Sequence, residues 1–254
     1  RQGFEYERER RKHERMHAMK DILVFGAGGF GMEVAFLIED CNQQEPRWNM
    51  LGYLDDAPEK WGAAIYGYTV LGGREWLANQ TRECCLALAV ADPQARRMLA
   101  EEVFRGKVEF PALIHPSVIM SRSVAAGEGT IICAGSILTV EIALGRHVHI
   151  NPGCTIGHEV TMEDYVTLYP GVNVAGKVTL RSGASLGTGC QVVQGLEIGS
   201  HAFLGAGSVA IRDVPPGAVA AGCPAQVKKQ TQLTVPAEMS DRGSPGTATT
   251  NDET

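Results

Sequence analysis

The chain has 254 residues, of which 44% are hydrophobic and 20% are charged, and its formal net charge is −6. This composition is typical of a globular protein, and the acidic balance argues against nucleic acid or an anionic membrane as the main partner. No apolar run reaches the roughly 18 residues of a membrane span, and the charged N-terminus does not resemble a secretory signal, so we expect a cytoplasmic protein. The seven cysteines form no CxxC pair, which is typical of reduced, buried thiols rather than of disulfides.

The two ends of the chain differ in composition from its middle. Residues 1–18 are mostly charged and have no apolar face to bury, so we expect a disordered extension outside the fold, with a solvated helix as the alternative. Residues 230–254 are rich in Thr, Ser, Pro and Gly, and we expect a disordered tail.

Residues 19–111 alternate between strand and helix patterns. A strand over 22–25 leads into a Gly-rich segment at 26–31, and a helical stretch follows. A second strand ends at Asp55 and Asp56, and further helix and strand patterns extend to residue 111. Because this alternation favours a parallel sheet, we expect a small Rossmann-like α/β domain.

Residues 112–213 follow a six-residue repeat. The third place of all seventeen hexads is apolar, and the first place is small or β-branched almost throughout. A period of six fits neither a flat sheet nor an α-helix, but three short strands with a bend after each one give a coil of 18 residues. Residues 18 apart then stack, and one internal column is Ile132, Ile150, Leu168, Leu186 and Leu204. We expect a three-sided β-helix here and a C-terminal wrap over 214–229.

Several short motifs occur in a fixed order along the chain. They are the Gly-rich segment 26–31, GYLDD at 52–56, YGYTVLGG at 66–73, IHPS at 114–117, IGHE at 156–159, GAGS at 205–208 and GCPA at 222–225. Together with the hexads, this series resembles the hexapeptide-repeat sugar acetyltransferases, both sialic acid O-acetyltransferase-like and bacillosamine-pathway N-acetyltransferases. The resemblance implies a left-handed β-helix, a homotrimer with its active site between subunits, acetyl-CoA as co-substrate, no metal, and a nucleotide-linked amino sugar as acceptor for surface glycan biosynthesis.

Acetyl transfer needs a base, an oxyanion donor and a means of holding both substrates. The resemblance implies that His158, at the corner of its hexad, is the general base and that Glu159 orients it. Gly176 lies 18 residues after His158, so it should stack directly above it, and in the family the matching glycine donates its N–H to the thioester region. A surface or subunit-contact role for His158 and an ordinary corner role for Gly176 are the alternatives.

The resemblance also places acetyl-CoA along the β-helix. It implies cofactor contacts at Gly205 and Ala206, and at Thr167, which stands where bacillosamine-type enzymes carry a second histidine. Lys228 and Lys229 would meet the phosphates of coenzyme A, or else form a solvated pair.

The Gly-rich segment satisfies G-x-G-x-x-G between a strand and a helix. The unit is too short for a complete dinucleotide-binding fold, so we expect it to bind the nucleotide part of the sugar substrate rather than NAD. A purely structural turn is the remaining alternative. We expect Gly28, Gly29 and Phe30 to approach the sugar diphosphate, and Asp55 or Asp56 to bind the base or ribose. Phe30 stands where some sugar acetyltransferases carry a histidine that touches the substrate.

Two other functions fit the same prism. A γ-carbonic-anhydrase-like metalloenzyme would need three clustered histidines, but the H-x4-H pair is absent and His147, His149 and His158 are wrongly spaced. A non-catalytic β-helix scaffold would not need His158, which is present.

Overall fold

The computed structural model describes residues 19–79 and 83–230. The predicted extension over 1–18 and the predicted tail from 231 onward lie outside these residues. Gln230, where we expected the tail to begin, is the last residue of a strand.

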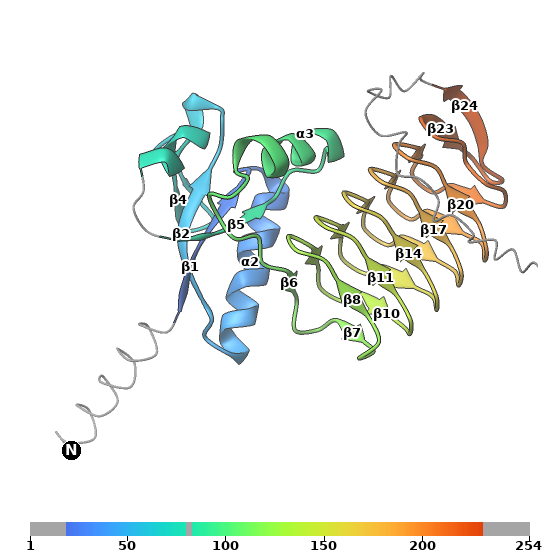
Figure 1. The fold of residues 1–254 in the computed structure, drawn as a ribbon, viewed down its shortest axis with the longest axis horizontal. Helices are drawn as coiled ribbons and strands as arrows, with labels where there is room; N and C mark the ends of the chain where they lie inside the picture. Colours follow the sequence, from blue (N-terminus) through green and yellow to red (C-terminus); the bar gives the residue numbers. More distant parts are fainter. Residues whose placement is uncertain (1–18, 80–82, 231–254) are drawn as a thin grey trace, which may run out of the picture.

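The N-terminal part is a mixed α/β unit with a five-stranded sheet in the order β3-β4-β2-β1-β5 (Figure 1). Its central strands are parallel, because β1 pairs in parallel with both β2 and β5. Residues Ile22, Leu23 and Val24 of β1 are fully buried, as a continuous apolar run in a doubly covered parallel strand should be. The Rossmann-like fold predicted for this region is therefore confirmed.

The elements of this unit have these bounds: β1 Lys20–Phe25, α2 Gly29–Gln44, β2 Trp48–Leu54, η1 Pro58–Lys60, β3 Ala64–Ile65, β4 Tyr68–Gly72, η2 Arg74–Asn79, β5 Cys85–Leu88, α3 Pro93–Met98 and the π-helical η3 Leu99–Val103.

The C-terminal part is a left-handed β-helix built from two-residue strands, which stack along one axis in Figure 1. The strands are β6 Leu113–Ile114, β7 Ile119–Met120, β8 Ala125–Ala126, β9 Ile131–Ile132, β10 Ile137–Leu138, β11 Ala143–Leu144, β12 His149–Ile150, β13 Thr155–Ile156, β14 Thr161–Met162, β15 Thr167–Leu168, β16 Asn173–Val174, β17 Thr179–Leu180, β18 Ser185–Leu186, β19 Gln191–Val192, β20 Glu197–Ile198, β21 Phe203–Leu204 and β22 Val209–Ala210. The longer strands β23 Ala218–Ala221 and β24 Gln226–Gln230 form an antiparallel hairpin that closes the last coil.

Three parallel sheets form the faces of the prism. Within the described residues they have the orders β22-β19-β16-β13-β10-β7, β20-β17-β14-β11-β8 and β24-β23-β21-β18-β15-β12-β9-β6. We call them face one, face two and face three. From β6 to β19, each strand pairs with the strand 18 residues further on, so the predicted coil length is confirmed for these coils.

The predicted internal column is also confirmed. On face three, Ile132, Ile150, Leu168, Leu186 and Leu204 are paired in one continuous register. All five side chains are fully buried and belong to one apolar core. Because alternate residues of a strand point to opposite sides, the residue before each of these points outward from face three.

The N-terminal unit covers the outer side of face three. Its apolar core continues into Leu113, Ile131 and Cys133 of the first coils. The fully buried side chain of Arg96, on α3, crosses the junction and donates hydrogen bonds to the backbone oxygens of His147 (3.1 Å) and Tyr165 (2.8 Å). These bonds attach α3 to two successive coils.

All seven cysteines are free thiols. Five of them are buried and Cys41 is partly buried, but Cys223, in the turn between β23 and β24, is exposed, so our expectation of buried thiols is wrong at that position. In the described ranges 19–79 and 83–230, no helix has the length and apolar character needed to cross a membrane.

Candidate active site

His158 lies at an exposed corner of the β-helix. The corner at residues 157–160 joins β13 on face one to β14 on face two. The imidazole Nδ1 lies 2.9 Å from Oε1 of Glu159, and the two side chains are 47% and 53% exposed. Since a carboxylate can only accept, this contact assigns the proton to Nδ1 and leaves Nε2 as a free acceptor.

Gly176 lies directly against the His158 ring, as the 18-residue arithmetic predicted. A Cβ built on Gly176 would be 2.5 Å from both Cε1 and Nε2 of His158. No hydrogen-bond acceptor for the Gly176 N–H occurs in the described parts of the chain, while its carbonyl accepts from Gly195. An N–H donor without an internal acceptor therefore lies beside the Nε2 atom of the imidazole.

Lys177 belongs to the same corner, although the sequence analysis did not single it out. Its Nζ is 3.8 Å from Oε2 of Glu159, and its backbone N–H donates to the carbonyl oxygen of His158. Glu159 and Lys177 both have left-handed backbone conformations, with φ near +60°. The spacing of 18 between them was the signal that could have found Lys177.

The Gly-rich segment 26–31 connects β1 to α2 at the carboxyl edge of the sheet. Gly28 and Gly29 are exposed, and neither the helix cap nor its first turn carries an acidic side chain. Gly31 must be a glycine, since a Cβ there would lie 1.9 Å from the carbonyl oxygen of Gly26. An uncapped helix N-terminus reached through glycines can bind an anionic group through its N–H donors.

The two aspartates predicted to bind base or ribose are instead engaged with the chain itself. The Asp55 carboxylate accepts the N–H of Ala27 at 2.8 Å and forms an ion pair with Lys60 at 2.8 Å. Burial raises the pKa of Asp55, but Lys60 and the N–H donors outweigh that effect and hold the pKa below its usual value. Asp55 therefore fixes the Gly-rich loop, and its direct contact with the base or ribose stays a prediction.

Asp56 is bound in a similar way. Its carboxylate accepts hydrogen bonds from the backbone and guanidinium of Arg74, which lower its pKa. Asp56 is more exposed than Asp55, with 39% of its side chain accessible against 14%. Both carboxylates have partners within the chain, and a contact between Asp56 and the base or ribose stays a prediction.

Thr167 does not line a cofactor surface. It is 1% exposed, and its Oγ1 accepts a hydrogen bond of 2.9 Å from the buried Arg96. The predicted cofactor contact at Thr167 is wrong within this chain, because α3 covers that stretch of face three.

The remaining predicted cofactor residues lie apart from His158. Gly205 and Ala206 belong to the corner that joins face three to face one, whereas His158 is on the corner between faces one and two. Ala206 is exposed, and Gly205 is partly covered by Ala221. Lys228 and Lys229 are exposed on β24. A single chain therefore does not bring these residues together with His158.

The Gly-rich loop and His158 lie on opposite sides of the prism. Phe30 at the loop packs against His149 on face three, with ring centroids 5.1 Å apart. The corner that carries His158 joins the other two faces, so it is the edge opposite face three. His149 and His158 belong to the same 18-residue coil, so the two sites lie at similar heights along the axis.

Two other histidines of the repeat, His115 and His147, have structural contacts. His115 Nε2 lies 2.9 Å from Asp40 Oδ2, and its Nδ1 binds Ser117. His147 is stacked on Tyr165. Burial, with help from Arg96 and Arg146, lowers the pKa of His147 to about 4, so it is neutral at pH 7.

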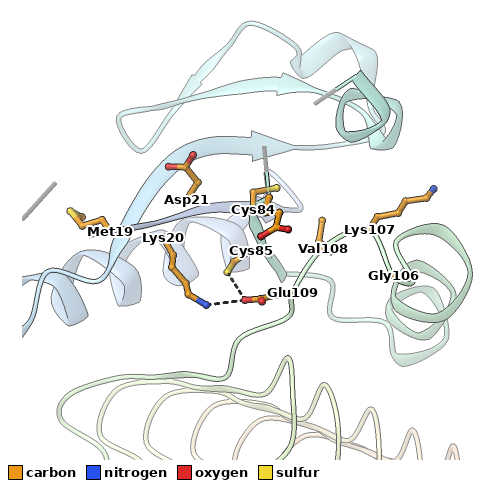
Figure 2. A pocket seen from close by; sticks show the side chains of 10 residues that line it. Met19, Lys20, Asp21, Cys84, Cys85, Gly106, Lys107, Val108 and Glu109 are labelled. Carbon is orange, nitrogen blue, oxygen red and sulfur yellow. Dashed lines mark hydrogen bonds and ion pairs between the residues drawn. The ribbon is translucent and has the colours of Figure 1, made fainter. Parts of the chain in front are cut away.

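A large cavity lies elsewhere, at the amino ends of β1 and β5. It has a volume of about 700 Å³, and its lining includes Lys20, Cys85 and Glu109. Figure 2 shows Glu109 pointing toward both Lys20 and the Cys85 thiol. None of the predicted site residues lines this cavity, which opens at the edge of the sheet opposite the Gly-rich loop. In the part of the chain that the structure describes, no group of three or more metal-ligating side chains occurs.

Comparison with known proteins identifies relatives of both halves. The family model "PglD N-terminal domain" matches residues 21–103. A UDP-N-acetylbacillosamine N-acetyltransferase from Bacillus subtilis (strain 168) is 34% identical over 126 residues, which cover 46% of this chain and 52% of that protein. The match thus spans about half the length of this curated relative.

Solved structures match over most of the chain. PerB from Caulobacter crescentus, in complex with CoA and GDP-perosamine, is 28% identical with a TM-score of 0.75, covering 84% of this chain and 99% of that one. The acetyltransferase domain of PglB from Neisseria gonorrhoeae FA1090, in complex with acetyl coenzyme A, is 26% identical with a TM-score of 0.75, covering 82% and 99%. WeeI from Acinetobacter baumannii AYE is 28% identical with a TM-score of 0.75, covering 82% and 100%.

Proposed function

Because residues 21–103 match the PglD N-terminal domain model and most of the chain is similar to solved sugar acetyltransferases, we propose that this protein is an acetyltransferase that uses acetyl-CoA to acetylate the amine of a nucleotide-linked sugar. The observation that carries this proposal is the His158–Glu159 pair lying against Gly176 at an exposed corner. The named relatives act on amino sugars, or have been solved with CoA and GDP-perosamine or with acetyl coenzyme A, which supports an amine over a hydroxyl acceptor.

The geometry supports a general-base mechanism. Glu159 holds Nδ1 of His158, so Nε2 accepts the proton that the sugar amine loses as its nitrogen attacks the thioester carbonyl. A C–N bond forms, and negative charge develops on the carbonyl oxygen, where the Gly176 N–H can donate a hydrogen bond. When the C–S bond breaks, the imidazolium returns the proton to the sulfur of coenzyme A. The carboxylate of Glu159 stabilises the transient imidazolium.

The N-terminal unit would hold the acceptor. The N–H groups of Gly28, Gly29 and Phe30, at the start of α2, would bind the sugar diphosphate, and the first turn of this helix carries no acidic side chain. Asp55 acts indirectly, because its bond to the Ala27 N–H fixes the shape of the loop.

A single chain cannot bring its own loop and its own base to one substrate, since they lie on opposite sides of the prism. We therefore propose a homotrimer in which the Gly-rich loop of one protomer faces His158 of its neighbour. Gly205 and Ala206 are on another corner and Lys228 and Lys229 are on β24, and these residues would hold acetyl-CoA in the same groove between subunits. The cytoplasmic location expected from the sequence stays a prediction.

The test is direct. Purified protein is incubated with acetyl-CoA and GDP-perosamine or a UDP-linked 4-amino sugar, and the release of free thiol is followed. We expect turnover in the wild type and a loss of about 10²- to 10⁴-fold in kcat for His158→Asn, which is typical for removal of a general base. A wild type that transfers acetyl to no nucleotide-linked amino sugar, or a variant with unchanged kcat, would contradict the proposal.

A further inference from the structure

A fully buried histidine lies between the Gly-rich loop and the β-helix. His149 is on β12, where it points outward from face three, and it is 0% exposed. Neither of its ring nitrogens has a hydrogen-bond partner among the residues that the structure describes. A buried polar group without a partner costs roughly 1–3 kcal/mol of stability. His149 therefore weakens the junction in which it lies, and the fold alone gives no reason for it.

The surroundings of His149 place it beside the proposed acceptor site. The ring of Phe30 lies against the imidazole at a centroid distance of 5.1 Å. Leu88, whose backbone is close enough to the imidazole to raise its pKa a little, ends β5 at the same carboxyl edge of the sheet as the Gly-rich loop. Burial, followed by the nearby Arg96 and His147, lowers the pKa of His149 well below its usual value, so the ring is neutral.

Phe30 packs against this imidazole and directly follows the two exposed glycines of the proposed diphosphate site. Gly28 and Gly29, the two residues before Phe30, are exposed, whereas Phe30 itself is only partly buried. Access to His149 from the Gly-rich loop requires this side chain to rotate. A neutral imidazole offers one donor and one acceptor, which suits a sugar hydroxyl or amine.

We propose that His149 is a substrate-binding residue, which hydrogen-bonds the sugar of the nucleotide-linked acceptor after the Phe30 ring moves aside. This inference rests on the proposed function, since the ligand is the acceptor of that reaction. It assigns to His149 a binding role and not the removal of a proton, which belongs to His158.

The variant His149→Phe distinguishes a role in substrate binding from a role in stability. Removing two unpartnered ring nitrogens from the core should raise the melting temperature, while the lost hydrogen bond should raise KM for the amino sugar about tenfold and leave KM for acetyl-CoA unchanged. His147→Phe is the matched control, because His147 is also buried on this junction but faces Gly129 and Tyr165. Its KM for the sugar should equal that of the wild type.

A second variant examines the role of Phe30. Phe30→Ala should lower KM for the sugar by opening the path to His149, and this gain should vanish in the double variant with His149→Phe. An unchanged sugar KM in His149→Phe, or a lower melting temperature, would overturn the inference. The wild-type assay with the same sugar is run first, so an inactive wild type would refute the proposed function, whereas a normal His149→Phe would refute only the role of His149.

Discussion

The contact between His158 and Gly176 is the most restrictive feature at the scale of single residues. The space above the imidazole is open because position 176 has no side chain. Any Cβ there would have to displace the ring, and the ring is held to Glu159 by a single hydrogen bond. The hydrogen bond to Glu159 thus orients the imidazole, and the lack of a side chain at position 176 leaves room for the ring and its Nε2 atom.

Gly176→Ala should therefore impair catalysis without unfolding the protein. The backbone at 176 is not in the left-handed region, and the atoms that the new Cβ would meet first are those of the His158 ring. We expect kcat to fall by roughly 10- to 100-fold, because a displacement of about 1 Å at a reacting group has effects of this size. Thiol-release kinetics and a thermal melt measure the two properties.

A double-mutant cycle supplies the control for this prediction. If Gly176 acts through His158, the effect of Gly176→Ala on kcat should be much smaller in a His158→Asn background than in the wild type. Equal effects in both backgrounds would mean that the glycine acts independently of the imidazole.

At this scale the sequence was a good guide only where the repeat fixes the geometry. The spacing of 18 predicted that Gly176 meets His158, since stacked coils keep a constant register. It could not predict that Thr167 is covered, because the covering residue, Arg96, is 71 positions away and belongs to another structural unit. It likewise could not predict that Asp55 and Asp56 bind Lys60 and Arg74, because no spacing rule links these carboxylates to cations in the short helices η1 and η2.

At the scale of elements, α3 anchors the N-terminal unit to the β-helix. Arg96 is fully buried and donates to backbone oxygens on both sides of the junction, including those of Val90 and Tyr165. Burial lowers the pKa of this guanidinium to about 9. Asp92 caps α3 by accepting the N–H of Ala95 at 2.7 Å, and a capping Asp before a Pro is a local signal for the start of a helix. The role of Arg96 has no such local signal.

Removing Arg96 should destabilise this junction. Arg96→Ala leaves several buried carbonyl oxygens without donors, so we expect the free energy of unfolding to fall by about 2–4 kcal/mol in urea titrations. The neighbouring Arg97 forms an exposed ion pair with Glu101, so Arg97→Ala should change the free energy of unfolding by less than about 1 kcal/mol. Equal losses in the two variants would show that Arg96 is not the anchor.

The same junction predicts sensitivity to acid. The pKa of His147 is lowered from 6.5 to about 4 in the folded protein, mainly by burial. Between these two pH values the unfolded chain binds a proton that the folded chain does not, so stability falls as the pH decreases from 6.5 to 4. The contribution of His147 over this window is about 3 kcal/mol, and His149 acts in the same direction.

Urea unfolding of the wild type and His147→Phe, measured at several pH values across this window, checks the prediction. The stability of the variant should fall less steeply with decreasing pH than that of the wild type. Parallel pH profiles would show that the protonation of His147 is not coupled to unfolding.

At the scale of the whole molecule, the repeat determines where the two halves of the site lie. The hexads predicted the prism and its internal column because a six-residue period leaves little freedom for the chain. They did not predict that the N-terminal unit packs on face three, opposite the corner with His158, since that depends on contacts between residues far apart in sequence. This placement is what makes a site within one chain impossible for our mechanism.

The most direct test of this account is complementation between two inactive chains. His158→Asn removes the base, and Gly28→Asp places a carboxylate at the proposed diphosphate site, where a Cβ meets no atom within 4 Å and an aspartate is a good helix cap. Each variant alone should be inactive. If the site is shared between neighbours in a closed ring, mixed trimers refolded or co-expressed at equal ratio should regain about a quarter of the wild-type activity, since about one groove in four then combines an intact loop with an intact base. Mixed trimers that remain inactive would contradict the shared site.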